Sequence, residues 1–173
     1  WQLHDEMGNV LEHNDFLIKP DNFNIPFDAE RIHGISTELA EEQGVSLDEC
    51  LTLFNEVLGK TKFIVGQNLN FDLNIMGCEF HRLGFENKMT SLPLLDTCTE
   101  KTALLCQIPG GRGGKFKLPT LTELHQHLFG VGFGDAHNAT ADVEATTRCF
   151  LELISTREFT KEQLDVDVNY FKN

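Results

Sequence analysis

The chain has 173 residues, of which 40% are hydrophobic and 9% aromatic, and its net charge is −13. This length and composition favour one globular domain with an ordinary buried core and exclude intrinsic disorder. The acidic balance argues against a protein that holds long duplexes through a broad basic surface. It is compatible with a small cleft in which metal ions neutralise a phosphate.

The cysteines and the hydropathy pattern indicate a cytoplasmic protein without a membrane partner. The five cysteines are odd in number and include no Cys-x-x-Cys pair, which favours reduced and mostly buried thiols. No apolar run is long enough to span a membrane, and no signal peptide is present. The chain begins with Trp1 rather than Met, so we expect a fragment of a longer polypeptide.

The first predicted elements are a hairpin and a helix. Residues 1–20 read as a hairpin that turns at Gly8 and continues in a partner strand at 16–18, and residues 21–35 read as a loop with a short turn at 31–34. The sequence Ser-Leu-Asp-Glu at 46–49 is a capping box, and apolar residues follow it at helical spacing to Leu58.

Strands and helices alternate in the middle of the chain. Residues 62–66 are short, apolar and β-rich, which predicts a buried strand. A helix is expected from Asn70 to a stop at Gly84, followed by a strand at 94–96 and a helix to Cys106. This order predicts an α/β fold with a mixed sheet flanked by helices.

The last third begins with a basic, glycine-rich loop at 109–117. A second capping box at 120–123 starts a short helix, and Asn138 is a plausible N-cap for a helical stretch at 143–154. The polar segment that follows reads as a peripheral helix or linker. We therefore expect one domain over residues 1–155 and an appendage over 156–173.

Two acidic residues stand where helices are expected to begin. A lone Asp at such a position usually complements the helix dipole, a contribution of ~0.3–1 kcal/mol. Asp72 and Asp142 both occupy junctions of this kind, and two such acids can share two divalent cations ~3.5–4 Å apart. His137 precedes Asp142 by five residues, so the two converge only if His137 lies in the loop before the helix.

These residues resemble two motifs of the DnaQ-like 3′–5′ exonucleases. Asn-Leu-Asn-Phe-Asp at 68–72 is similar to the second motif of that family. His-Asn-Ala-Thr-Ala-Asp-Val-Glu-Ala at 137–145 is similar to the third motif in its histidine variant, the DEDDh group. Shorter stretches agree in order and spacing, at 31–35, 95–97 and 118–121. Proofreading subunits or domains of bacterial replicative polymerases, such as the epsilon subunit of DNA polymerase III, are the most similar members.

The resemblance implies an RNase H-like fold and removal of nucleotides from a single-stranded DNA 3′ end with two Mg²⁺ or Mn²⁺ ions. It assigns Asp142 to the more tightly held metal and Asp72 to the second. His137 would take the proton from the attacking water, which a neutral imidazole can do near neutral pH. Asn68 and Phe71 would line the pocket for the terminal nucleotide.

This chain departs from the family at the first motif. The family carries Asp-x-Glu-Thr on its first strand, where both acids share one face. Here residues 1–5 resemble the strand that follows it, and the adjacent Asp5 and Glu6 would point to opposite faces. We therefore expect the first strand to be missing from this polypeptide. On its own, this chain should be close to inactive.

Two other functions stay open. One is an inactive module that binds nucleic acid or a polymerase subunit. The other is an exoribonuclease that trims RNA, which differs from a DNA exonuclease in contacts to the 2′-hydroxyl.

Three weaker signals point elsewhere. The glycine-rich loop lacks the first Gly and the Ser or Thr of a phosphate-binding loop, so we expect an ordinary surface loop. A weaker hypothesis is that its Arg112, Lys115 and Lys117 contact the substrate backbone. The acidic stretch at 165–169 lacks the Gly of a calcium loop. His125 and His127 do not share a helix face.

Overall fold

In the computed structural model, residues 1–134 and 138–156 are described. Short strands and helices alternate along most of the chain. The elements are β1 Gln2–His4, β2 Val10–His13, α1 Phe27–His33, α2 Thr37–Gln43, α3 Leu47–Leu58, β3 Ile64–Gly66, α4 Leu69–Leu83, η1 Lys88–Ser91, β4 Leu94–Asp96, α5 Glu100–Cys106, η2 Arg112–Gly114, α6 Leu121–Phe129 and α7 Ala139–Ser155. The protein is therefore of the mixed α/β class.

The strands form two separate pairs in the described part of the chain, β1 with β2 and β3 with β4. β1 and β2 are antiparallel, and Gly8 with a φ of 84° permits the turn between them. The predicted partner strand at 16–18 is wrong: Val10–His13 pairs with β1, and Ile18 makes an isolated parallel bridge with Val45 instead. The tight turn at Gly8 brings the residues that directly follow it back onto β1, which leaves residues 16–18 beyond the end of the hairpin.

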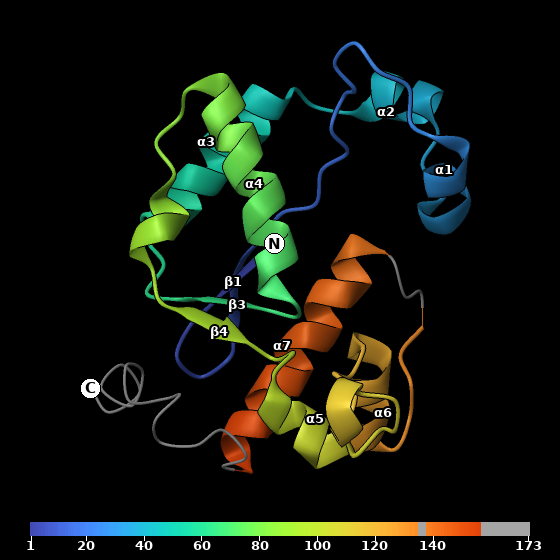
Figure 1. Cartoon of the computed structure of the whole chain (residues 1–173). Helices are drawn as coiled ribbons and strands as arrows, with labels where there is room; N and C mark the ends of the chain where they lie inside the picture. The colour runs from blue at the N-terminus through green and yellow to red at the C-terminus, as the bar shows by residue number, and fades with distance from the viewer. Residues whose placement is uncertain (135–137, 157–173) are drawn as a thin grey trace.

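The second pair, β3 and β4, is parallel, and helix α4 provides the crossover connection that parallel strands require. In Figure 1, α3 and α4 lie on one side of the strands and α5, α6 and α7 on the other, so the strands form a middle layer. Each helical layer has its own core. The α3 and α4 side is built on Leu51, Leu58, Phe80 and Met89, and the α7 side on Leu95, Leu124, Cys149, Phe150 and Leu153.

α1 occurs where a loop was expected, and α2 lies just beyond that loop, in a stretch for which no element was predicted. α1 begins after Pro26 and ends at Gly34, whose φ of 75° suits a helix C-cap, and α2 begins at Ser36, whose hydroxyl accepts a hydrogen bond from Leu39 N. α1 buries none of its residues and α2 buries only Ala40. The loop prediction failed at α1 because this helix lacks the apolar stripe that marks a core-facing helix.

The remaining helices confirm their sequence signals. Ser46 caps α3, and Thr120 with Glu123 forms a reciprocal capping box on α6. α4 ends at Gly84 with a φ of 70°, and the strand at 94–96 leads into α5 as predicted. The strand predicted at 62–66 forms at Ile64–Gly66, but its residues are half-buried and not buried as expected.

No helix within the described residues is long and apolar enough to cross a membrane. The cysteines in this part of the structure are free thiols, and burial raises the pKa of the Cys149 thiol to about 12. The expected appendage at 156–173 falls almost wholly outside the described residues.

Candidate functional site

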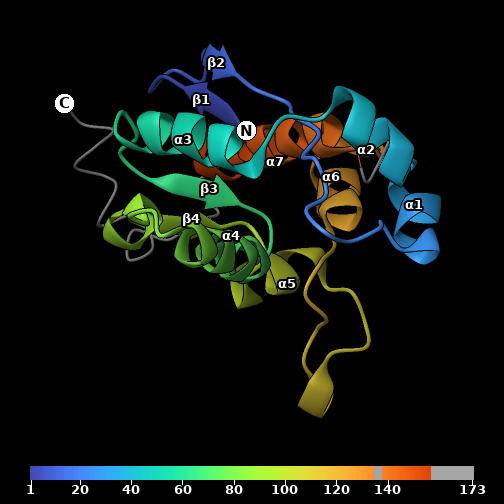
Figure 2. The same cartoon turned by 90° about the horizontal axis from the view of Figure 1, so that it is seen from above.

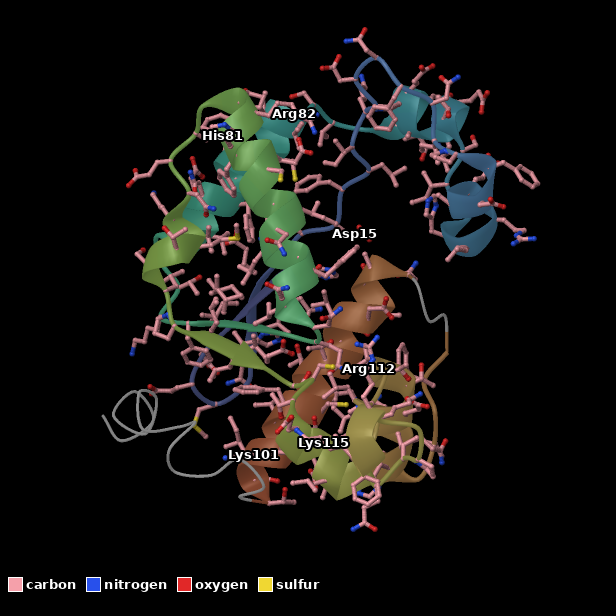
Figure 3. The ribbon with its side chains drawn as sticks, viewed as in Figure 1. Asp15, His81, Arg82, Lys101, Arg112 and Lys115 are labelled. Atoms are coloured by element: carbon pink, nitrogen blue, oxygen red, sulfur yellow. The ribbon has the colours of Figure 1, made fainter. Side chains whose placement is uncertain are left out.

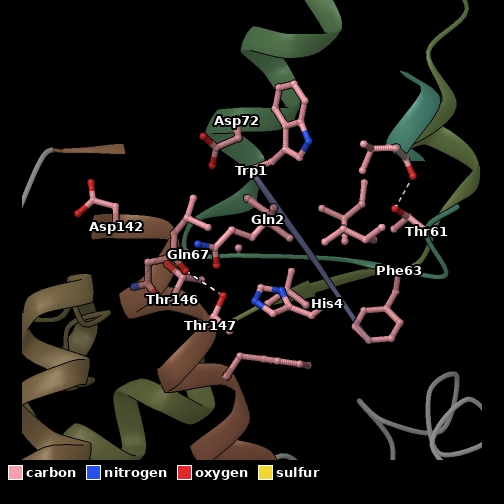
Figure 4. A pocket seen from close by; sticks show the side chains of 18 of the residues that line it. Trp1, Gln2, His4, Thr61, Phe63, Gln67, Asp72, Asp142, Thr146 and Thr147 are labelled. Carbon is pink, nitrogen blue, oxygen red and sulfur yellow. Dashed lines mark hydrogen bonds between the residues drawn. The ribbon is translucent and has the colours of Figure 1, made fainter. Parts of the chain in front are cut away.

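A cavity of about 880 Å³ lies between the β1–β2 hairpin, strand β3 and helices α3, α4 and α7. Asp72 from α4 and Asp142 from α7 both line it, together with Gln67 at the end of β3. Figure 4 shows the two acids at the same end of the cavity, opposite Thr61 and Phe63. Two carboxylates 70 positions apart in the sequence thus border one space.

Asp72 stands in the first turn of α4, directly after the junction with β3. Its side chain is exposed to solvent, yet surrounding protein partly desolvates the carboxylate. This desolvation raises the pKa of Asp72, and the negative charge of Asp96 raises it further, while a backbone hydrogen bond acts in the opposite direction. The carboxylate therefore sits where a cation would be stabilised by two negative charges.

The start of α4 is held from a different part of the chain. Asn68 occupies the N-cap with a left-handed backbone, φ 63° and ψ 47°, and its side chain caps nothing. Instead the Asp96 carboxylate accepts hydrogen bonds from Asn68 N at 2.8 Å, Leu69 N at 3.0 Å and Cys98 N at 2.8 Å. The end of β4 thereby caps the helix that carries Asp72.

The same junction is tied to the loop before α6. Thr97 is fully buried, and its hydroxyl donates to Gln67 Oε1 at 2.5 Å. Gln67 Nε2 in turn donates to the Pro119 carbonyl at 2.8 Å. These two hydrogen bonds hold the end of β3 against the loop that precedes α6.

Asp142 stands in the first turn of α7, whose N-cap is Asn138, as the sequence predicted. The Asn138 side chain accepts hydrogen bonds from Thr140 N at 3.1 Å and Ala141 N at 3.2 Å. The Thr140 hydroxyl also donates to Asp15 Oδ2 at 2.7 Å, which connects this helix start to the segment after β2. Asp142 itself is half-buried.

The other predicted site residues lie outside the lining of the cavity or outside the described residues. Asn68 and Phe71 are next to Asp72 in sequence and are exposed, Phe71 by 62%, and neither belongs to the lining of the cavity. The exposed aromatic ring of Phe71, one residue before Asp72, is available to stack on a base, but the nucleotide pocket stays a prediction. His137 lies outside the described residues.

The donor chemistry of the acids decides whether they suit a metal site. Carboxylate oxygens are the ligands that Mg²⁺ and Mn²⁺ prefer, so Asp72 and Asp142 fit the expected ions in kind. In the described ranges, however, no group of three or more His, Cys, Asp or Glu residues is placed to hold a metal ion. The pair thus fits a divalent site as part of a donor set.

Two residues that matter for the site received no role from the sequence. Asp96 was noted only as part of a strand-to-helix step, and nothing in its neighbourhood along the chain reveals that it caps α4. His4 was not singled out, yet it lines the cavity, and burial lowers the pKa of its imidazole although Asp5 opposes the shift. A neutral imidazole in this position adds no positive charge to the cavity at neutral pH.

The basic loop carries ion pairs. Lys115 Nζ contacts Glu100 Oε1 at 2.6 Å, and Lys117 Nζ contacts Glu123 Oε1 at 2.6 Å. The loop projects from the body of the molecule in Figure 2, and Figure 3 shows Lys101, Arg112 and Lys115 in the region of α5 and α6. Contact of this loop with a substrate backbone stays a prediction, and two of its cations already have acidic neighbours.

His125 is a core residue and takes no part in the site. It is 1% exposed, its Nδ1 lies 2.8 Å from the Val131 carbonyl oxygen, and its ring packs against Phe129 and Phe133. The sequence argued against it as a metal ligand for a geometric reason, and its burial gives it a structural role.

Comparison with known proteins gives one family and two relatives. The family model RNase T, described as an exonuclease, matches residues 3–150. The chain is 30% identical over 149 residues to the 3′-5′ exonuclease DinG of Bacillus subtilis (strain 168), a match that covers 86% of the chain and 14% of DinG. It is 29% identical over 154 residues to a PolC-type DNA polymerase III of Pediococcus pentosaceus, covering 88% of the chain and 10% of the polymerase. The chain thus spans a small part of the length of both relatives.

Proposed function

The chain belongs to the exonuclease family that the RNase T model describes, and from this premise we propose that it acts in a metal-dependent 3′–5′ exonuclease. The reaction is hydrolysis of the phosphodiester at a 3′ end, which releases a nucleoside 5′-monophosphate. The observation that carries the proposal is that Asp72 and Asp142, each in the first turn of a helix, line one cavity beside the end of β3. The fold that we propose for this domain is RNase H-like.

The roles of the residues follow from their chemistry. Asp72 and Asp142 would hold two Mg²⁺ or Mn²⁺ ions. When bound, such ions neutralise phosphate charge and lower the pKa of water. His137 would accept the proton of the attacking water, and Asn68 and Phe71 would contact the terminal nucleotide. With a net charge of −13, the chain would depend on such ions to neutralise the charge of a phosphate backbone.

Single-stranded DNA is the proposed substrate, and proofreading in DNA replication is the proposed setting. Support comes from the names of the two relatives, one a 3′-5′ exonuclease and the other a DNA polymerase III. On this proposal a replicative polymerase subunit is the partner, and the protein works in the cytoplasm.

The two acids alone form an incomplete site on this proposal. In the described part of the chain they are not joined by a third ligand, whereas Mg²⁺ takes near-octahedral coordination. We therefore expect the 173-residue chain alone to be close to inactive. A strand that supplied two further carboxylates should raise the activity.

A second function is favoured by the same observation. A domain with too few metal ligands can still bind a nucleic acid or a polymerase without cleaving. In that case every form of the protein would bind single-stranded DNA and release no nucleotide at any Mg²⁺ or Mn²⁺ concentration.

The experiment that tests the proposal is a nuclease assay on the gene-encoded form of the protein. Oligonucleotides of DNA and RNA labelled at the 5′ end would be incubated with Mn²⁺ and with EDTA. Stepwise shortening of DNA from the 3′ end, present with Mn²⁺ and absent with EDTA, is the expected result. His137→Ala should slow it by about 10²–10⁴-fold if the imidazole is the general base.

The matched control is His127→Ala, because this histidine lies on α6 and does not line the cavity. It should leave the rate unchanged. Equal loss in both variants, or faster shortening of RNA than of DNA, would contradict the proposed roles and substrate.

A further inference from the structure

Residues 20–44, which we call the arm, leave the body of the molecule and return to it at one point. Two backbone hydrogen bonds close the base of the arm, from Lys19 N to the Val45 carbonyl at 2.9 Å and from Val45 N to the Leu17 carbonyl at 2.8 Å. Helices α1 and α2 lie within the arm, and Figures 1 and 2 both show α1 at the outer side of the molecule. The arm is therefore a distinct projection with a fixed base.

The arm exposes large apolar side chains. Phe23 is 56% exposed, Phe27 75% and Ile32 61%. Single exposed apolar residues are ordinary on a protein surface, but a concentration of them marks an interaction site. These three lie within residues 23–32, so the arm is a candidate for such a site.

Helix α1 lacks the packing that normally stabilises a helix. It has seven residues, ends at a left-handed Gly34, and buries none of its side chains. Isolated helices shorter than ~12–15 residues are marginal in water, because most helical stability in proteins comes from tertiary packing. Phe27 and Ile32 are five positions apart and thus point to different sides of α1. A partner that covered both would have to follow the helix around its surface, which a flexible segment can do.

The arm is also strongly acidic. Its single cation, Arg31, lies 4.0 Å from the Asp28 carboxylate, and both side chains are exposed. Six acids share the arm with this arginine, namely Asp21, Asp28, Glu30, Glu38, Glu41 and Glu42. The exposed apolar groups therefore stand in a negative electrostatic field.

This charge decides the class of partner that fits the arm. A phosphate backbone would be repelled, and so would the anionic surface of a membrane. A second copy of the chain would bring the same acidic surface against itself. A polypeptide segment that carries both cations and apolar side chains is complementary to both features of the arm.

We propose that the arm is a docking surface for a flexible segment of a partner protein, rich in lysine or arginine and in large apolar residues. Its apolar side chains would cover Phe23, Phe27 and Ile32, and its cations would lie against the acids of the arm. The surface gives a place to the protein partner that the proposed function implies. It would bind such a segment whether or not the chain belongs to a working nuclease.

The test uses the 173-residue chain and three fluorescently labelled probes. The first is a peptide of lysine, leucine, phenylalanine and glycine, and the second is the same peptide with glutamate in place of each lysine. The third is an oligothymidylate. Fluorescence anisotropy measures the affinity of each probe, and NMR amide shifts locate the residues that it contacts.

The lysine peptide should bind and should shift amides of residues 20–44. The glutamate peptide should bind at least about tenfold more weakly, because like charges then face each other. Added salt should weaken binding of the lysine peptide, since the charges on both sides are exposed.

The apolar part of the surface is tested by the double variant Phe27→Ser and Ile32→Ser. Affinity for the lysine peptide should fall by at least about tenfold, as truncation of central contact residues does. The matched control is Leu104→Ser, which changes a leucine of α5 that is 62% exposed and lies outside the arm. This control should leave the affinity unchanged.

The acidic part is tested by a second double variant, Glu41→Gln and Glu42→Gln. It should weaken binding of the lysine peptide and reduce the salt dependence. Its matched control is Glu56→Gln with Glu86→Gln, two acids outside the arm that are likewise exposed. If a variant does not fold, the amide shifts of the wild-type chain decide the question.

Four results would overturn the docking surface. Absence of binding by the lysine peptide would remove it, and equal loss in a variant and its control would show that the peptide binds any acidic surface. Arm amides shifted by the oligothymidylate would show that nucleic acid is the occupant. Self-association in light scattering, lost in Phe27→Ser with Ile32→Ser, would show that a second copy is.

The nuclease proposal fails separately. If the lysine peptide docks on the arm but the gene-encoded protein releases no nucleotide with Mn²⁺, the docking surface stands and the proposed chemistry is wrong. If nucleotide is released but the arm binds no peptide, the chemistry stands and the docking surface is wrong.

Discussion

The two acids of the site stand in the same position on their helices, but the helices begin in different ways. α7 is capped by its own Asn138, a local bond between neighbours in sequence. α4 begins with a left-handed Asn68 and is capped by Asp96, which lies 27 residues from Leu69 in sequence. Asp142 is thus positioned by local sequence, whereas Asp72 is positioned by the tertiary fold.

This difference has a consequence for stability and for electrostatics. A local cap contributes to one helix, while the Asp96 carboxylate joins α4, the end of β4 and the start of the next loop through three amides. Burial raises the pKa of Asp72 and the charge of Asp96 raises it further, so the group that positions this acid also adds to the shift in its pKa. We expect substitutions at the two helix starts to differ in size accordingly.

The largest effect is expected at Asp96. Asp96→Ala leaves the Asn68, Leu69 and Cys98 amides without their acceptor and should lower the free energy of unfolding by about 2–4 kcal/mol, as loss of hydrogen bonds to a charged group does. Urea denaturation measures it. Asp96→Asn keeps one acceptor oxygen and should cost less than half as much; equal loss in both variants would contradict the capping role.

A smaller effect is expected at Asn68. Its φ of 63° is costly for most side chains, so Asn68→Ala should destabilise the protein by about 1–2 kcal/mol. Asn68→Gly should be neutral or slightly stabilising, because glycine adopts this conformation without strain. The two variants are compared by thermal unfolding, and a loss of stability in Asn68→Gly equal to that in the alanine variant would show that the side chain, not the backbone, matters.

At Asn138 we expect a loss of stability that is typical of a local helix cap. Asn138→Ala should lower the free energy of unfolding by about 1 kcal/mol, and Asn138→Ser should restore most of it. Denaturant melts of both variants provide the measurement. A loss as large as that of Asp96→Ala would remove the distinction between the two helix starts.

The smallest effect is a pH dependence from Asp72. Because its folded pKa is raised above the ordinary value of 3.8, Asp72 favours folding below that pH and this contribution is lost as the pH rises through the raised pKa. The free energy of unfolding of the metal-free wild type should therefore fall relative to that of Asp72→Asn as the pH rises from 3.8 through the raised pKa. At higher pH the difference between the two proteins should stay constant. A difference that is constant from acid to neutral pH would contradict the assignment.

The part of the fold that could be predicted from sequence is the part that local interactions determine. Ser46, Thr120, Asn138 and Gly84 mark helix ends through bonds to near neighbours, and the structure confirms each of them. α1 was missed because an exposed helix leaves no apolar periodicity. The partner of β1 was misplaced because the pattern of alternation does not state which of two apolar segments the turn brings back.

The sequence predicted which acids belong to the site, but not how the structure brings them together. Both acids were found from their places at helix starts, but their shared cavity depends on how α4 and α7 pack around β3, which no local pattern contains. The capping of α4 by Asp96 is likewise invisible in sequence, since its partners are 27 and 28 residues away. The half-buried state of β3 could not be predicted either, because its composition is that of an inner strand.

The most direct test of the central claim, that Asp72 and Asp142 act together in one metal site, is a double-mutant cycle. Mn²⁺-dependent release of nucleotide from single-stranded DNA would be measured for the gene-encoded protein, for Asp72→Asn, for Asp142→Asn and for the double variant. Residues that act as a unit are strongly non-additive, so the double variant should be no slower than the slower single variant. Losses that multiply, or a single variant that keeps the full rate, would contradict the claim.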